Sequence, residues 1–262
     1  MNTIQKCKHG LMIFNRKDII AGQSLDNYGE FSEKQIELIK NFINEDSVIY
    51  DIGANIGCFT IPFARLVPKG SVFAFEPERH NFYSLCGNIA INNINNVYCY
   101  QYAIGDNSGS IFVPELDHEQ SFDHGNISLI DKYNCNGYNS IMTTIDSIKS
   151  NKCNLLKINN CGMEINALRG GLENINANKP YIIINNNAEN ITEGSDVNEL
   201  IEFIKSLNYK IYFLKQDFFN LNNFYENKNN IFLSNNYNNL FCHHKEIEIK
   251  NDLIKKFDLV SA

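Results

Sequence analysis

A glycine-bearing turn after an apolar segment is the strongest chemical signal in the sequence. In Tyr50-Asp-Ile-Gly-Ala-Asn-Ile-Gly57, the two glycines directly follow the strand-like residues 47–52. Ligands of open α/β sheets bind at the carboxyl ends of strands, where glycine permits close backbone approach. The Gly-x-x-x-Gly spacing differs from the Gly-x-Gly-x-x-Gly of NAD sites. Asp51 suits a cationic ammonium group better than a pyrophosphate, so the turn predicts a ligand that carries no phosphate.

A second acidic residue, Glu76, stands at the end of the next apolar segment, residues 72–75. It follows Gly57 by 19 positions (76 − 57). An acidic residue about 20 positions beyond the glycine turn accepts hydrogen bonds from ribose hydroxyls. A ribose, an ammonium group and a sulfonium cation coexist in S-adenosylmethionine, so this nucleoside is the predicted cofactor.

The elements that must position these residues alternate between strand and helix. Ser32-Glu-Lys-Gln35 reads as a capping box, and Ile36, Ile39 and Ile43 give one helical face. Strand-like segments are residues 47–52, 72–75, 97–104, 155–158, 181–184, 210–214 and 230–233. Helix-like segments are residues 59–67, 80–94, 163–175 and 196–207. This alternation predicts a mostly parallel sheet with helices on both faces.

The remaining segments complete a single predicted domain, residues 1–262. Residues 1–46 are expected to form a lead-in hairpin and helix, and residues 47–262 a Rossmann-like core. Residues 109–114 are consistent with a small hairpin, and the polar and aromatic residues 216–229 with a cover over one end of the sheet.

Composition narrows the class of partner. The chain has 262 residues, a net charge of −7 and a 44% hydrophobic fraction. Nucleic-acid-binding domains usually carry a basic stripe, and none is visible here, so nucleic acid is not the expected partner. No apolar run of about 20 residues predicts a membrane span, and the first residues lack an apolar signal core. We therefore expect a cytoplasmic protein; its oligomeric state is left open.

Several motifs together resemble the FkbM-type methyltransferases over nearly the whole chain. The motifs are Leu25-Asp-Asn-Tyr-Gly-Glu-Phe-Ser32, Asp51-Ile-Gly-Ala-Asn-Ile-Gly57, Ala74-Phe-Glu-Pro77, the Leu85/Asn88/Asn92 pattern, Ala103-Ile-Gly-Asp106, Thr144-Ile-Asp-Ser147 and Leu155-Leu-Lys-Ile-Asn-Asn-Cys-Gly-Met-Glu164. The resemblance implies the seven-stranded class I methyltransferase sheet and methyl transfer from S-adenosylmethionine to a hydroxyl, often on a sugar or polyketide.

The same resemblance implies roles for individual residues. Asp51, Gly53, Asn55 and Gly57 would line the methionine end of the cofactor. Glu76 would take the ribose, and the stretch around Ala103 and Asp106 would lie near the adenine.

The sequence departs from the family pattern at the ends of two later strands. The resemblance leads us to expect carboxylates at positions 159, 161, 185 and 187, where this chain has Asn159, Cys161, Asn185 and Asn187. An amide keeps the shape of a carboxylate but cannot act as a general base. Hard cations prefer charged oxygens, so no metal site is expected here.

Two hypotheses follow from this departure. In the first, methyl transfer persists because alignment of the acceptor supplies much of the rate. The expected catalytic residues are then Asn159, Glu164 and His124, with His118 as another possible base. In the second, the chain is a degenerate relative that binds cofactor without catalysis.

Weaker candidates lie elsewhere in the sequence. His243 and His244 are possible metal ligands, although neighbouring residues of a strand point to opposite faces. Cys161 is a possible reactive thiol, more simply a packing residue. The aromatic residues Phe218, Phe219, Phe224 and Tyr225 suit either a sugar-stacking wall or a cover for the core.

Overall fold

The computed structural model describes residues 2–129, 135–148, 150, 152–185, 197–232 and 237–262. The chain begins with an antiparallel hairpin of β1 (Asn2–Cys7) and β2 (Gly10–Asn15), followed by α1 (Ala21–Tyr28) and α2 (Glu33–Ile39). The predicted capping box is wrong. Ser32 has left-handed backbone angles (φ 50°), and its side chain does not cap α2.

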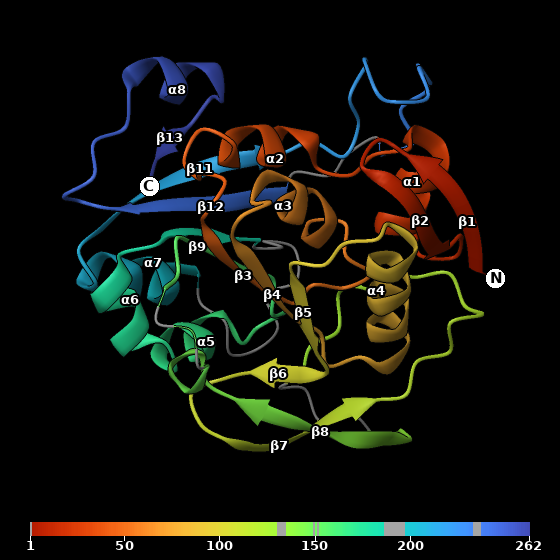
Figure 1. Cartoon of the computed structure of the whole chain (residues 1–262), viewed down its shortest axis with the longest axis horizontal. Helices are drawn as coiled ribbons and strands as arrows, with labels where there is room; N and C mark the ends of the chain where they lie inside the picture. Colours follow the sequence, from red (N-terminus) through yellow and green to blue (C-terminus); the bar gives the residue numbers. More distant parts are fainter. Residues whose placement is uncertain (1, 130–134, 149, 151, 186–196, 233–236) are drawn as a thin grey trace.

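A mixed sheet of eight strands forms the centre of the described part of the molecule (Figure 1). The spatial order is β13 (Val260–Ser261), β11 (Tyr209–Gln216), β12 (Tyr237–His244), β10 (Tyr181–Ile184), β9 (Leu155–Ile158), β3 (Val48–Ile52), β4 (Ser71–Phe75) and β5 (Val97–Tyr100). The strands from β10 to β5 are parallel, whereas β12 is antiparallel to both of its neighbours. The mostly parallel sheet is thus as predicted. The expected count of seven is exceeded because β13 pairs with the edge strand β11.

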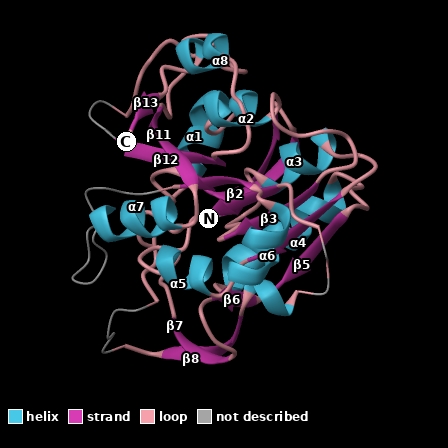
Figure 2. Cartoon of the chain, turned by 90° about the vertical axis from the view of Figure 1, so that its left-hand side faces the viewer, coloured by secondary structure: helices cyan, strands magenta, loops and turns pink. Residues whose placement is uncertain are grey.

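Helices cover both faces of this sheet, as Figures 1 and 2 show. Successive strand residues point to opposite faces: Ile182 and Ile184 pack into one apolar cluster and Ile183 into another. The first cluster includes residues of α5 (Glu164–Arg169), α6 (Leu172–Asn178) and α7 (Val197–Ser206). The opposite face receives α2, α3 (Thr60–Leu66), α4 (Arg79–Ile91) and the segment around α8 (Asn251–Lys256).

A small separate sheet contains β6 (Tyr102–Ile104), β8 (Gly137–Thr143) and β7 (Gly109–Pro114). The predicted single strand over residues 97–104 is therefore two strands, divided at Gln101, whose carbonyl oxygen accepts a hydrogen bond from Ser140 Oγ. The predicted hairpin at 109–114 is instead one strand, β7, paired antiparallel with β8. These pairings lie far apart in sequence, so local patterns did not indicate them.

Two further predictions are corrected by the later elements. The helix expected over residues 163–175 is divided between α5 and α6 at Gly170 and Gly171, where a Cβ on Gly170 would lie 2.0 Å from the carbonyl oxygen of Gly105. Residues 230–232 are not a strand, and β12 takes the predicted place beside β11. Leu233 and Asp196, each at the end of a predicted element, lie outside the described residues. A 3₁₀ turn, Ile145–Ser147, precedes β9.

The aromatic residues after β11 pack against the lead-in segment. Phe219 contacts Tyr28 of α1 with ring centroids 5.4 Å apart, and Phe218 contacts Phe31 at 5.7 Å. Tyr225 donates a hydrogen bond to the carbonyl oxygen of Lys6 in β1. These side chains serve as a cover, and none of the four aromatic candidates lines the cavity described below. Across the described helices, we find no segment with the length and apolar character of a membrane span.

Candidate active site

The two glycines of the β3–α3 turn make different close contacts. Gly53 has φ 68°, and a Cβ there would lie 1.9 Å from the carbonyl oxygen of Asn159. Gly57 has φ 93°, and a Cβ there would meet Leu85 of α4 at 2.9 Å. Left-handed angles and this crowding both require glycine. Gly53 therefore lets the ends of β3 and β9 approach each other, whereas Gly57 lets α4 pack against the turn.

Asp51 is fully buried and already paired. It lies opposite Lys157 in the register of β3 and β9, and its Oδ1 is 2.9 Å from Lys157 Nζ. The two groups form an ion pair, but the angle at this contact is too poor for a hydrogen bond to Oδ1. Thr60 Oγ1 donates to Oδ2 at 2.6 Å. Asp51 consequently helps to hold the ends of β3 and β9 together.

Lys157 has further contacts beyond this carboxylate, one of them a weaker hydrogen bond to the carbonyl oxygen of Ile52 at 3.4 Å. Its Nζ donates to the carbonyl oxygen of Gly53 at 2.7 Å and lies 5.3 Å from the ring centre of Phe59. Its side chain is 3% exposed. The ammonium group therefore connects β9, the glycine turn and α3. Sequence reasoning missed this residue, although a lysine inside an otherwise apolar strand was the available signal.

Glu76 lies at the carboxyl end of β4 and is held by backbone amides. Asn55 N–H donates to Oε2 at 2.7 Å, and Glu78 N–H donates to Oε1 at 2.9 Å. Burial raises the pKa of Glu76 to about 7, against these hydrogen bonds, which lower it. A carboxylate offers roughly four lone-pair sites, so the two amides leave acceptor capacity for a ligand.

A cavity joins the ends of β3, β4 and β9. Its lining residues are Gly53, Glu76, Pro77, Glu78, Asn81, Val113, Gly125, Ile127, Leu129, Asn159, Asn160 and Cys161. Four predicted site residues, Gly53, Glu76, Asn159 and Cys161, are thus brought together. Residues 113–129 also contribute Val113, Gly125, Ile127 and Leu129, none of which sequence reasoning assigned to the site.

The remaining predicted cofactor residues do not line this cavity. Asn55 lies beside it with φ 50°, and its buried Oδ1 has no hydrogen-bond partner. Ala103 is buried in β6. Asp106 is exposed and accepts a hydrogen bond from Asn166 Nδ2.

The acceptor-side positions have neutral contacts. Asn159 N–H donates to the carbonyl oxygen of Ile52, and the Cys161 thiol donates to Asn126 Oδ1 at 3.2 Å. Burial raises the pKa of Cys161, so its thiol is a packing group and not a reactive thiolate. Asn185 Oδ1 accepts from Gln35 Nε2 of α2. Asn187 lies outside the described residues.

The two predicted bases, His124 and Glu164, differ in how their polar atoms are already hydrogen-bonded. His124 is 2% exposed, and both ring nitrogens are engaged, with His118 Nδ1 at 3.3 Å and the carbonyl oxygen of Gln120 at 3.2 Å. Burial lowers the pKa of His124. Glu164 begins α5, three residues after Cys161, and its Oε2 accepts from Gly162 N–H; burial raises its pKa. Neither residue is among those that line the cavity, although Glu164 lies only three positions beyond the lining residue Cys161.

A further acid beside the cavity, Asp123, was missed by sequence reasoning. Its Oδ1 accepts from Gly125 N–H, and Gly125 lines the cavity. Burial raises the pKa of Asp123 to about 6. It lies on an irregular segment without a motif, so no sequence signal marked it.

The other candidates lie elsewhere. His243 and His244 are buried in β12, where His243 stacks on Tyr212 and His244 packs edge-on against Tyr209. Their environment is aromatic packing.

The cavity around Glu76 fits the ribose of S-adenosylmethionine. Glu76 faces it with spare acceptor capacity, Gly53 leaves room for close approach, and Asn55 Oδ1 is a buried acceptor that lacks a partner. The methionine end fits less simply, because Asp51 is occupied by Lys157 and Thr60.

Comparison with known proteins gives one family. The model of the methyltransferase FkbM domain matches residues 51–211. "Methyltransferase 1" of Beauveria bassiana is 32% identical over 94 residues, which cover 33% of this chain and 38% of that protein. A tRNA(Phe) (4-demethylwyosine(37)-C(7)) aminocarboxypropyltransferase of Methanocaldococcus jannaschii is 43% identical over 54 residues, 21% of this chain and 22% of that enzyme. These matches thus span well under half of either relative.

A solved structure shares the fold. The crystal structure of methyltransferase FkbM from Methylobacillus flagellatus superimposes with a TM-score of 0.53 at 18% identity. The superposition covers 77% of this chain and 44% of that one.

Proposed function

The chain belongs to the FkbM methyltransferase family, whose cofactor is S-adenosylmethionine, and we propose that it methylates a hydroxyl oxygen of a sugar or glycan. The observation that carries the proposal is Glu76. It ends β4 with both carboxylate oxygens fixed by backbone amides, and it faces the cavity bounded by Asn159 and Cys161. This is the placement that a ribose-binding acid needs beside an acceptor pocket.

The chain's own residues would then divide the work. S-adenosylmethionine, when bound, supplies an electrophilic methyl group on a sulfonium sulfur. Glu76 would orient the ribose and thereby the whole nucleoside. Asn159 and Asn160 at the end of β9 would hold the acceptor in line with the methyl group, and such alignment can supply much of the rate.

A nearby carboxylate would act as the base that removes the proton from the acceptor hydroxyl. Glu164 and Asp123 both have raised pKa values because of burial, and a base works best when its pKa approaches the working pH. Glu164 follows the acceptor-side loop directly and is proposed as the base, with Asp123 as its alternative. His124 is not proposed, because both of its ring nitrogens are engaged.

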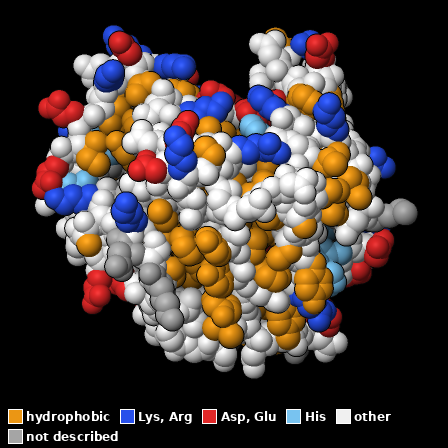
Figure 3. Space-filling model, viewed as in Figure 1, with side chains coloured by type: hydrophobic (Ala, Val, Ile, Leu, Met, Phe, Trp, Pro, Cys, Tyr) orange, Lys and Arg blue, Asp and Glu red, His pale blue; other side chains and the backbone are white. Residues whose placement is uncertain are grey.

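A sugar acceptor is supported by the lining of the cavity. The cavity is lined by the amide residues Asn159 and Asn160 and by the apolar residues Val113, Ile127 and Leu129. Asn160 Nδ2 already donates to the carbonyl oxygen of Ile104, so its Oδ1 is the atom left for an acceptor. A sugar has hydroxyls for the amides and an apolar face for the hydrocarbon. On the face drawn in Figure 3, Lys and Arg side chains are interspersed with Asp and Glu. The net charge of −7 favours a neutral acceptor over a polyanionic one.

The test is methyl transfer from radiolabelled S-adenosylmethionine to a panel of glycosides, with RNA as a competing substrate class. Glu164→Gln should lower the rate by about 10²–10⁴-fold if it is the base, while affinity for S-adenosylhomocysteine stays the same. Asp46→Asn, an exposed acid, is the matched control. Methylation of RNA but of no glycoside would contradict the acceptor class.

A second function is favoured by one observation, the neutral acceptor side at Asn159, Cys161 and Asn185. The chain would then bind cofactor without transferring methyl groups. Tight binding of S-adenosylhomocysteine without turnover on any acceptor would favour this second function. Glu164→Gln and Asp123→Asn should then leave the affinity for S-adenosylhomocysteine unchanged.

A further inference from the structure

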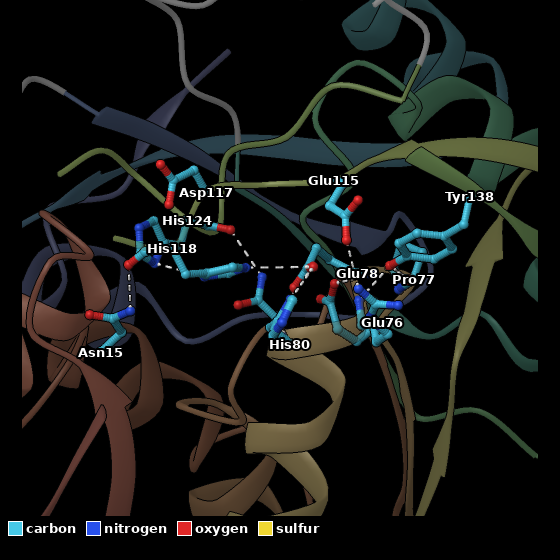
Figure 4. A network of polar contacts seen from close by, with 12 residues as sticks. Asn15, Glu76, Pro77, Glu78, His80, Glu115, Asp117, His118, His124 and Tyr138 are labelled. Carbon is cyan, nitrogen blue, oxygen red and sulfur yellow. Dashed lines mark hydrogen bonds and ion pairs between the residues drawn. The ribbon is translucent and has the colours of Figure 1, made fainter. Parts of the chain in front are cut away.

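Three donor side chains converge where α4 begins, and the proposed methyl transfer uses none of them. Glu78 caps α4, His80 lies in its first turn, and His118 comes from residues 115–129 after β7 (Figure 4). Glu78 Oε1 lies 3.3 Å from His80 Nδ1 and 3.6 Å from His118 Nε2. One donor atom from each residue lies within 4.8 Å of the other two.

We propose that Glu78, His80 and His118 bind a divalent transition metal, with Zn²⁺ as the best match. Bonds of about 2.0–2.1 Å in a tetrahedral site place neighbouring donor atoms about 3.3–3.4 Å apart. The separations of 3.3 and 3.6 Å around Glu78 Oε1 are close to that geometry. Imidazole nitrogens with one carboxylate oxygen form a common ligand set for zinc.

The hydrogen bonds of His118 orient a lone pair toward this point. The carbonyl oxygen of Gln120 can only accept, so His124 carries its proton on Nε2 and, when neutral, accepts at Nδ1. His118 Nδ1 must then donate to His124 Nδ1. In neutral His118 this leaves Nε2 unprotonated, buried and without a hydrogen-bond partner, facing a carboxylate oxygen. Two acceptors that face each other need either a proton or a metal ion between them, and the third ligand atom nearby, Nδ1 of His80, is what favours a metal.

The surroundings resemble the outer contacts of a metal site. Glu78 Oε2 accepts from Asn81 N–H, which leaves Oε1 for the metal. His118 is oriented by His124, as metal-bound histidines usually are by a second hydrogen bond. His80 is 47% exposed, so solvent has access to the remaining coordination position.

This site is distinct from the acceptor-side positions where the sequence led us to expect no metal. Its effect would be on the cavity wall, since Glu78 lines the cavity and residues 115–129 contribute Gly125, Ile127 and Leu129 to it. A metal would fasten this segment to α4.

The experiment is calorimetric titration of the chelator-treated full chain with ZnCl₂, free of cofactor. We expect one equivalent of zinc, with affinity at least about tenfold lower in His80→Ala and in His118→Ala. His80 is half-exposed, so its replacement should leave the fold intact even if the His118 variant does not fold. Zinc should also raise the melting temperature of the wild-type chain.

Two control variants separate this site from adventitious binding. His9→Ala removes a histidine that also pairs with a glutamate, Glu33 at 2.6 Å, and Cys135→Ser removes an exposed thiol. Neither should change zinc affinity. The proposal is overturned if the wild-type chain takes up no stoichiometric zinc, or if His80→Ala binds it as tightly as His9→Ala does. His118 would then be an imidazolium paired with Glu78.

Discussion

The two halves of the parallel sheet end in different chemistry. In the half formed by β3 and β4, the strand ends carry the buried acids Asp51 and Glu76. In the half formed by β9 and β10, the strands are followed by the amides Asn159 and Asn185. The first half needs partners for its charges: Asp51 has Lys157, and Glu76 has two backbone amides.

This difference shows that a buried charge needs partners within the protein. Removing an ion from water costs several kcal/mol unless it is paired and hydrogen-bonded. The partners around Asp51 and Glu76 meet that need. The acceptor half is neutral and needs no such support. Lys157 belongs to β9 but pairs with Asp51 of β3, so this one side chain links the two halves.

Restoring acids to the acceptor half would test the comparison most strongly. Asn159→Asp, Cys161→Glu and Asn185→Glu together should raise turnover by up to about 10²–10⁴-fold if a missing base limits the rate. Glycoside methylation, or slow cofactor hydrolysis, is the assay, with a melting curve as the control for folding. A well-folded variant that binds cofactor and is no faster would show that the neutral residues are not the deficit.

Breaking the buried pair should show its cost. Lys157→Met leaves Asp51 buried without a cation, with only the Thr60 hydroxyl as a partner. We expect a loss of about 3–5 kcal/mol in the free energy of unfolding, measured with urea. The exposed pair Lys69–Glu45 is the matched control, because Lys69→Met should cost at most about 1 kcal/mol. Equal losses in the two variants would contradict the distinction between the halves.

Replacing Gly53 of the turn with alanine should cost more stability than the same change at an uncrowded glycine. Gly53→Ala forces a left-handed backbone angle and a clash with Asn159, so about 1–3 kcal/mol of stability should be lost. Cofactor affinity should fall as well, since Gly53 lines the cavity. Gly109→Ala, where the nearest atom outside its neighbours is 3.9 Å away, should be nearly neutral in thermal unfolding.

The pH dependence of binding should reveal Glu76. Its pKa of about 7 means that it is protonated below neutrality, and ribose hydroxyls donate best to the ionised form. The affinity for S-adenosylhomocysteine should therefore fall about tenfold from pH 8 to pH 6, measured calorimetrically with a chelator present. Glu76→Gln should bind more weakly and show little of this dependence. An unchanged slope in that variant would assign the titration to another group.

The same pKa shift has a consequence for stability. Because the pKa of Glu76 in the folded chain, about 7, lies above its ordinary value of 4.5, the folded state holds the proton more tightly. The contribution is fully present below about pH 4.5 and is lost as pH rises through 7. Glu76→Gln should thus stabilise the apo chain relative to wild type at pH 8 and less so at pH 5, in thermal unfolding.

The sequence alone determined the order of most strands and helices, because apolar periodicity and glycine turns are local signals. It also singled out Gly53, Glu76, Asn159 and Cys161, which line one cavity, since each lies within three residues of the end of a recognisable strand. Tertiary structure decided the rest. The register of β3 against β9 set Lys157 opposite Asp51 and so gave that buried acid an ammonium partner. The separate β6–β8–β7 sheet and the place of Val113, Gly125, Ile127 and Leu129 in the cavity lining depend on contacts between distant segments, which no local pattern encodes.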